Sequence, residues 1–287
     1  MSFSTYLSQA WEQHALETEN VAQNLMSGVQ LIENSEQITQ MAQLIAHVLG
    51  EHMGEWEKGI ETLQVLKKHQ FVVKGSEEEG AIDRSITALQ LASGRAENLR
   101  RFSSSDQVRI LALAASALAE RDPGGAQGHF QRALEIARGG FEKEDPANRA
   151  LAVTGNNIAA SLGEKSSLSS HELELMILAA QTARKFWEIA GTWIHVERAE
   201  YRLAMSFLKS GDVRQALIHA QNCLKIIEQN QGEPLEAYFG YEALALAERA
   251  RGNLLGYQNA ATRAREKFEV LRPEDKPWVQ ESLNRLI

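Results

Sequence analysis

Residues 203–224 contain the feature that most constrains the fold, a pair of amphipathic helical segments joined by a tight turn. The small residues Ala216, Ala220 and Cys223 recur at i, i+4 and i+7 and form one stripe along the second segment. Gly-Asp at residues 211–212 interrupts the helical pattern, because glycine favours turns and aspartate favours helix starts. The sequence therefore predicts two antiparallel helices that approach each other closely through small side chains.

Imperfect copies of this pattern follow one another along the chain. The second strong copy covers residues 113–133, a fair match covers residues 54–66, and a further copy covers residues 244–264. Equivalent positions lie 50, 40 and 41 residues apart, at Ala126, Met176, Ala216 and Tyr257. A single helix pair cannot bury its apolar face, so recurring pairs predict a stacked array with one continuous core.

The recurring residues resemble the tetratricopeptide repeat (TPR), which places small residues, an aromatic and a Gly-Asp turn at these intervals. The residues that carry the resemblance are Leu203, Ala204, Phe207, Gly211, Asp212, Ala216, Ala220 and Cys223. Repeats of about 40 to 42 residues exceed the standard 34 and are similar to those of kinesin-light-chain-like and bacterial regulatory TPR proteins. The resemblance is good over residues 106–271, partial over 36–70 and absent over 1–35. It implies an all-α fold, an α-solenoid (superhelix) of antiparallel helix pairs.

The same pattern divides the chain into three parts. We expect an N-terminal helical cap of less regular pattern at residues 1–35, a TPR-like array at residues 36–276, and a C-terminal capping helix at residues 277–287. Residues 4–33 are helical in pattern, and Ser-Gly at 27–28 is a candidate break or bend. The number of repeats stays open, because residues 76–105 fit either one helix or two.

Composition and charge exclude several classes of protein. Hydrophobic residues make up 44% of the 287 residues, which is sufficient for a continuous core, and the formal net charge of −8 disfavours binding to nucleic acid. No export signal and no long apolar run is present, so we expect no membrane association. The only cysteine, Cys223, excludes an internal disulfide and is typical of a reducing compartment, so we expect a cytoplasmic protein.

No motif indicates catalysis, a cofactor or a metal. His47 and His52 are five residues apart, a spacing that does not fit two ligands on one face of an α-helix, and His171 and Glu174 lack a third ligand nearby. Cys223 lies in the small-residue stripe and is interpreted as a packed thiol. The glycines at 124–128 follow no strand and are interpreted as a turn. We therefore expect no enzyme activity and assign the histidines to the surface or the edge of the core.

The TPR resemblance also implies which residues face the concave groove. The first helix of each TPR pair normally lines this groove. Carried over position by position, the inward-facing residues are Val153, Asn156, Ala160, Arg198, Tyr201, Met205, Lys209, Phe239, Glu242, Leu246 and Arg249. Tyr201 and Met205 stand where TPRs that grip a C-terminal carboxylate have Lys and Asn, so this sequence departs from that pattern.

Three hypotheses of function follow. The first is a non-enzymatic, bacterial-type adaptor that binds a peptide or helical segment of a protein partner through Asn156, Arg198, Tyr201, Met205, Lys209, Phe239, Glu242 and Arg249. The alternative is a signal-responsive regulator in which residues 1–70 form an effector bundle. An enzyme is the third. Self-association stays open as well, because repeat arrays expose apolar ends unless they are capped.

Overall fold

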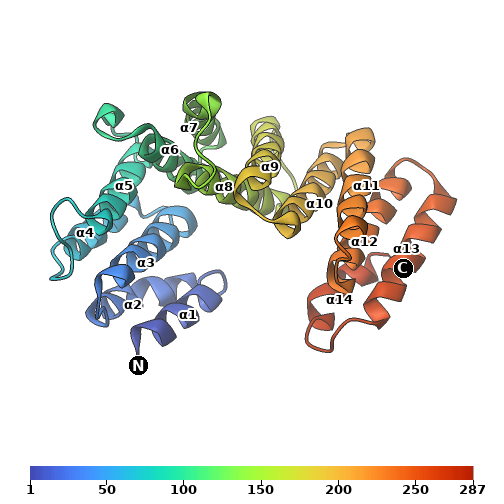
Figure 1. Cartoon of the computed structure of the whole chain (residues 1–287), viewed down its shortest axis with the longest axis horizontal. Coiled ribbons are helices and arrows are strands. Elements are labelled where there is room, and N and C mark those ends of the chain that lie inside the picture. Colours follow the sequence, from blue (N-terminus) through green and yellow to red (C-terminus); the bar gives the residue numbers. More distant parts are fainter. Residues whose placement is uncertain (287) are drawn as a thin grey trace. The chain divides into compact units, whose positions relative to one another are not determined.

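The computed structural model describes residues 1–286, and over these residues the protein contains fourteen α-helices and no strand (Figure 1). Helices that follow one another in sequence pack in adjacent pairs. The predicted all-α class is therefore confirmed. Within the described residues, no helix combines the length and the apolar character that crossing a membrane requires.

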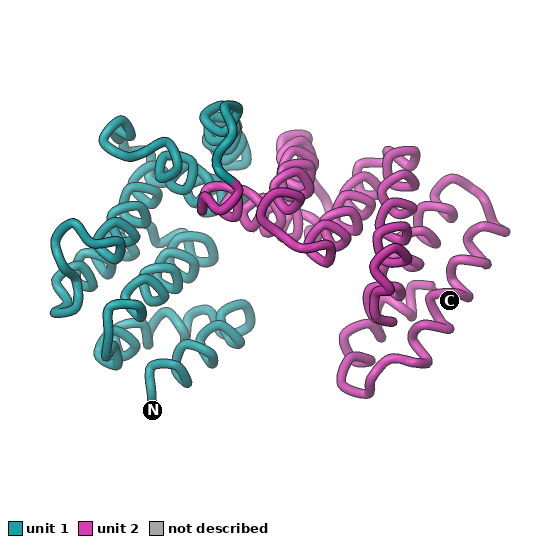
Figure 2. Tube along the Cα trace, in the orientation of Figure 1, with its two compact units in different colours: residues 1–142 teal, residues 143–287 magenta. Residues whose placement is uncertain are grey.

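The chain divides into two compact units, which Figure 2 colours separately. Unit 1 is Met1–Glu142 and unit 2 is Lys143–Ile287. The part boundaries that the sequence suggests at residues 35 and 276 are not tested by this division and stay predictions.

Unit 1 begins with three mutually packed helices and continues with helices that pack in sequence order, α4 on α5, α5 on α6 and α6 on α7. A π-helix, η1, follows α3 directly and packs against α2, α3, α4, α5 and α6. The elements are α1 (Phe3–Gln13), α2 (Thr18–Gln30), α3 (Ser35–Ile45), η1 (Ala46–His52), α4 (Trp56–Leu66), α5 (Glu77–Ala92), the 3₁₀ turn η2 (Leu99–Arg101), α6 (Ser104–Leu118), α7 (Pro123–Ile136) and the 3₁₀ turn η3 (Ala137–Gly139).

The N-terminal helical segment breaks at a different place from the one predicted. The break between α1 and α2 lies at residues 14–17, whereas the sequence suggested 27–28. Gly28 is buried inside α2, where an added Cβ would lie 2.2 Å from Cε1 of Tyr6. Glycine at this position therefore lets α1 pack closely on α2 and does not end the helix.

Between residue 76 and the start of α6 at Ser104 the chain forms one α-helix, α5, followed by the 3₁₀ turn η2. The Ser76 hydroxyl accepts a hydrogen bond from the Glu79 amide at 3.3 Å and so caps the N-terminus of α5. The Glu79 carboxylate accepts from the Gly75 amide at 2.7 Å, one residue before the Ser76 amide that a capping box would use. Gly94 has a φ of 81° beyond the end of α5, a left-handed conformation that glycine adopts at little cost.

Unit 2 contains three helix pairs and one C-terminal helix. The pairs are α8 with α9, α10 with α11, and α12 with α13, and each pair packs on the next through α9–α10 and α11–α12 contacts. The first helices of successive pairs also touch, α8 with α10 and α10 with α12. The elements are α8 (Pro146–Glu164), α9 (Ser170–Ala190), α10 (Trp193–Ser210), α11 (Val213–Gln229), α12 (Pro234–Ala250), α13 (Leu254–Glu269) and α14 (Lys276–Asn284).

Two of the turns within pairs have the same construction. Gly211 ends α10 with a φ of 83°, and the side chain of Asp212 caps α11 by accepting from the Gln215 amide at 3.1 Å. Gly252 has a φ of 80°, and the Asn253 side chain caps α13 in the same way. The turn that the sequence predicted at 211–212 thus recurs one pair later with glycine and an Asx cap.

Small side chains bring neighbouring helices of unit 2 together. Ala204, Ala220 and Ala243, from α10, α11 and α12, form one fully buried cluster. Gly155 of α8 lies closer still to α9, because an added Cβ would be 2.5 Å from the carbonyl oxygen of Ala179. These positions explain why the sequence repeats small residues where a larger side chain would bury more apolar area.

We expect Gly155→Ala to lower the free energy of unfolding in urea by about 1 to 2 kcal/mol, because overpacking against the α9 backbone outweighs the gain in helix propensity. Gly163→Ala in the same helix is the control, since its Cβ would meet only a guanidinium nitrogen of Arg202 at 3.7 Å. Equal stabilities for the two variants would contradict the close approach of α8 and α9.

Candidate functional site

Helix α10 presents one row of predicted groove residues. Arg198, Tyr201, Met205 and Lys209 follow one another at intervals of three and four residues, which places them on one face of a helix. Tyr201 and Met205 on this face also pack against the buried cluster of Ala204, Ala220 and Ala243. The sequence therefore positions a continuous polar and apolar row beside α8 and α12.

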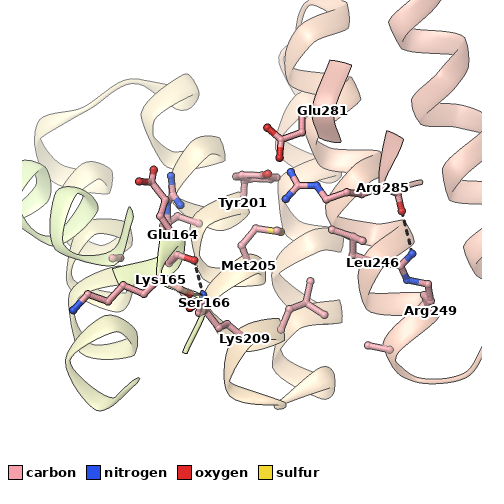
Figure 3. A pocket seen from close by; sticks show the side chains of 16 residues that line it. Glu164, Lys165, Ser166, Tyr201, Met205, Lys209, Leu246, Arg249, Glu281 and Arg285 are labelled. Atoms are coloured by element: carbon pink, nitrogen blue, oxygen red, sulfur yellow. Dashed lines mark hydrogen bonds between the residues drawn. The ribbon is translucent and has the colours of Figure 1, made fainter. Parts of the chain in front are cut away.

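A pocket of about 830 Å³ lies along this row within unit 2. It is bounded by the end of α8, by α10, by the end of α12 and by the C-terminal segment that includes α14 (Figure 3). The residues whose side chains give it its chemical character are Glu164, Lys165, Tyr201, Arg202, Met205, Lys209, Leu246, Arg249, Glu281 and Arg285.

Four of the eight predicted partner-binding residues line this pocket, namely Tyr201, Met205, Lys209 and Arg249. The other four lie outside its lining. Asn156 is half-buried on α8, Arg198 is exposed and pairs with Glu236 at 2.9 Å, Phe239 packs its ring against Tyr201, and Glu242 is fully buried. The structure thus gathers half of the predicted set in one place.

Glu242 supports the pocket from beneath and does not reach its surface. Its Oε2 accepts a hydrogen bond from the Tyr201 hydroxyl at 3.1 Å, and its Oε1 has no hydrogen-bond partner within residues 1–286. The nearest cation to Oε1 is Arg285, at 3.7 Å. Burial raises the pKa of Glu242, and burial together with this carboxylate raises the pKa of Tyr201. The phenol is therefore fixed as a neutral hydrogen-bond donor.

Lys209 and Arg249 are largely engaged by backbone carbonyls. The Lys209 ammonium donates to the carbonyl oxygens of Gly163, at 2.7 Å, and of Lys165, both at the C-terminal end of α8 (Figure 3). Arg249 donates to the carbonyl oxygen of Arg285 at 3.1 Å. Cations at a helix end satisfy carbonyls that have no partner in the helix, so these two side chains mainly hold the walls of the pocket in place.

Arg202 is the pocket residue with unused hydrogen-bonding capacity, and the sequence analysis did not select it. Its Nε is buried without a partner, and its guanidinium makes no hydrogen bond to the described residues. Burial lowers the pKa of Arg202, and the carboxylate of Glu164 partly opposes this effect. A guanidinium with free donors beside a cavity can take a carboxylate or phosphate in a bidentate geometry.

Arg285 is the second residue that sequence reasoning missed. It follows α14 and is exposed, and its guanidinium points toward Tyr201, near Glu281 (Figure 3). The segment is held by the Tyr238 hydroxyl, which hydrogen-bonds to the Ser282 hydroxyl at 2.6 Å. The predicted C-terminal helix therefore exists, and it contributes side chains to the pocket as well as packing on α12 and α13.

Helix α10 also buries two carboxylates, Glu197 and Glu200, which have contrasting surroundings. Glu197 receives a hydrogen bond from the Cys223 thiol at 2.9 Å, and its other oxygen is without a partner, so burial raises its pKa to about 7. Burial acts to raise the pKa of Glu200 as well, but hydrogen bonds from His219 and Arg184 hold that pKa below its ordinary value. The two groups therefore contribute to stability with opposite dependence on pH.

We expect Tyr201→Phe to destabilise the chain by about 1 to 3 kcal/mol, because it leaves the buried Glu242 carboxylate without its donor. Urea unfolding monitored by circular dichroism measures the change. Tyr241→Phe in α12 is the matched control, since the Tyr241 hydroxyl has no hydrogen-bond partner within residues 1–286 and should be removable at little cost. If Tyr201→Phe is as stable as this control, the hydrogen bond from Tyr201 to Glu242 does not stabilise the chain as we expect.

We also expect a pH-dependent effect of Glu197→Gln. The native pKa of about 7 lies above the ordinary 4.5, so the wild-type chain loses stability as pH rises through this window and keeps the penalty above it. Relative to wild type, Glu197→Gln should gain about 2 to 3 kcal/mol between pH 4 and pH 8. Glu200→Gln should show the opposite trend, because the lowered pKa of Glu200 stabilises above its unfolded value and this contribution disappears in acid. Parallel pH profiles for the two variants would contradict these assignments.

No known protein-family model matches the chain, and no curated protein sequence matches it either. The geometry of the pocket is therefore the basis on which a function is proposed.

Proposed function

We propose that the protein is a TPR-type interaction module whose unit 2 binds an acidic segment of a partner protein in the pocket beside α10. The observation that carries the proposal is the Arg202 guanidinium, which lines the pocket without a hydrogen-bond acceptor among the described residues. A carboxylate side chain of the partner would provide that acceptor.

The repeat assignment is supported by the construction of unit 2. Two successive pairs share a left-handed glycine and an Asx cap at the turn, and alanines fill equivalent positions between helices. The first helices of neighbouring pairs lie side by side, which is the arrangement that lines a groove in a TPR array. We extend the proposal to the helix pairs of unit 1, taken separately, as repeats of the same type.

The charge of the pocket indicates an acidic partner. Five cationic side chains and two carboxylates line it, although the whole chain carries a formal net charge of −8. Of the cations, Lys165 pairs with Glu172 at 2.5 Å, while Lys209 and Arg249 are bound to carbonyls. Arg202 remains as the side chain that contacts the partner's carboxylate, together with Arg285, which is exposed and forms only a long ion pair with Glu242 at 3.7 Å. Such complementary charge favours one class of partner over others.

An apolar anchor would complete the interaction. Met205 and Leu246 line the pocket together with the ring of Tyr201 (Figure 3). Methionine adapts to side chains of different shape, and a partly buried aromatic ring adds apolar area with one polar tip. We therefore propose a recognised segment in which an Asp or Glu is followed or preceded by a large apolar residue.

The regulator hypothesis receives no specific support. It assigns residues 1–70 to a separate effector bundle, but the compact unit that includes them extends to Glu142. In that unit α3 packs against α4 and α5. We therefore do not carry the regulator hypothesis further.

The proposal is tested with a fluorescent peptide library in which each acidic peptide has a twin with Asn and Gln in place of Asp and Glu. We expect the full-length protein to select acidic peptides over their twins. We expect Arg202→Ala/Arg285→Ala to weaken binding at least about 100-fold, because hydrogen bonds to charged groups contribute about 1.5 to 3 kcal/mol each. Affinity should fall as salt is raised.

The matched control is Arg263→Ala/Arg272→Ala, which removes two exposed arginines that pair with neighbours outside the pocket. This control should bind the selected peptides as wild type does. Equal binding of acidic peptides and their amide twins, or unchanged binding by the pocket variant, would overturn the proposal.

A further inference from the structure

Three histidines that are distant in sequence converge in unit 1. His14 follows α1, while His47 and His52 belong to η1. One ring nitrogen from each lies within 4.8 Å of the others, and the Nε2 atoms of His47 and His52 are 3.0 Å apart. The ring of Trp11 packs against His14 and His47 and covers one side of the cluster.

The π-helix explains why the sequence spacing was misleading. On an α-helix, residues five apart point in directions about 140° different. In a π-helix, amides bond to carbonyls five residues back, so residues five apart lie almost above one another. The Met53 amide bonds to the Val48 carbonyl oxygen in this manner, at 3.0 Å. The unusual helix therefore places His47 and His52 on one face, and π-helices occur often at functional sites.

Hydrogen bonds orient two of the three rings with Nε2 toward the cluster. His14 Nδ1 lies 2.6 Å from the Trp11 carbonyl oxygen, and His47 Nδ1 lies 3.1 Å from the Glu51 carboxylate. Glu51 is fixed in turn by the Ser116 hydroxyl, which donates to it at 2.7 Å from helix α6. Carbonyl and carboxylate acceptors on Nδ1 are the partners that metal-binding histidines characteristically have.

The segment that carries His52 is also held in place. Arg121, after α6, donates to the carbonyl oxygens of Glu51 at 2.8 Å and of His52 at 2.7 Å. The backbone that carries His52 is therefore fixed beside His47.

We propose that His14, His47 and His52 form a binding site for Zn²⁺, with water in the fourth position. Three imidazole nitrogens suit this ion, and tetrahedral Zn–N bonds of about 2.0 to 2.1 Å put the ligand nitrogens about 3.3 Å apart. The separations of 3.0 Å and up to 4.8 Å bracket this value, so small rotations of the rings complete the site. The exposure of His52 leaves a path to solvent. The site is independent of the pocket in unit 2 and of the function proposed for it.

The competing arrangement is a metal-free hydrogen bond between His47 and His52. In that arrangement one Nε2 keeps its proton and donates to the other, and no cation is required. Zinc binding through both Nε2 atoms moves this proton to the other nitrogen of the donating ring, so that imidazole stays neutral and changes tautomer. Because protons compete with Zn²⁺ for the same lone pairs, binding should become weaker at low pH.

The test uses the full-length protein without a histidine tag, dialysed against a chelator and then titrated with Zn²⁺ alone. Calorimetry and elemental analysis should give one Zn²⁺ per chain. We expect His14→Gln and His52→Gln each to weaken binding at least tenfold, and Glu51→Gln to weaken it about tenfold through the orientation of His47. His171→Gln, at an exposed histidine of α9, should bind as wild type does.

Two further readouts keep the test decisive even if a variant is poorly folded. Co²⁺ bound to the unmutated protein should give the intense visible absorption of a tetrahedral site, and micromolar Zn²⁺ should raise its melting temperature. Failure of the unmutated protein to bind one Zn²⁺ at micromolar concentration would overturn the proposal. So would an octahedral Co²⁺ spectrum, or wild-type affinity in folded His14→Gln and His52→Gln chains.

Discussion

Close approach between helices is the constraint on which the rest of this structure depends. Small residues occupy the contacts at Gly155 between α8 and α9, and at Ala204 and Ala220 between α10 and α11. A larger side chain at Gly155 would meet backbone atoms of α9, which cannot move without moving the whole helix. Because these contacts fix helix positions closely, the long side chains on the remaining faces are held at defined places.

Helix α10 illustrates the consequence. Ala204 packs into the core on the side of the helix that also buries Glu197 and Glu200, and the adjoining side carries Tyr201, Met205 and Lys209 to the pocket. Buried carboxylates usually reduce stability, unless partners compensate for their lost hydration. Glu200 has such partners and Glu197 has only a thiol. The buried Glu197 carboxylate therefore lowers the stability of unit 2 at a position close to the pocket proposed as its functional surface.

The sequence predicted local structure better than it predicted sites. The periodic small residues and the Gly-Asp pair at 211–212 predicted the helix pair α10 and α11 and the turn between them. Gly28 was misinterpreted because a glycine that permits close packing and one that ends a helix look alike without the partner, here Tyr6.

Site residues were harder to predict for the same reason. Tyr201, Met205, Lys209 and Arg249, which the TPR resemblance selected, line one pocket of unit 2. The resemblance could not show that Glu242 is covered or that Arg285 reaches the pocket. Both facts depend on how the C-terminal segment folds back on α12. The histidine cluster depends on a π-helix and on a contact with α1, and neither has a signature in a 3.6-residue period.

The central claim is that the Arg202 guanidinium, in the pocket of unit 2, binds a carboxylate of the partner protein. The most direct measurement is the NMR signal of its Nε–H group, assigned by comparison with Arg202→Lys, during titration with an acidic peptide and with its amide twin. The account predicts that the acidic peptide shifts this signal and protects its proton from exchange, whereas the twin does neither. An Arg202 signal that stays unchanged while the acidic peptide binds would contradict the account.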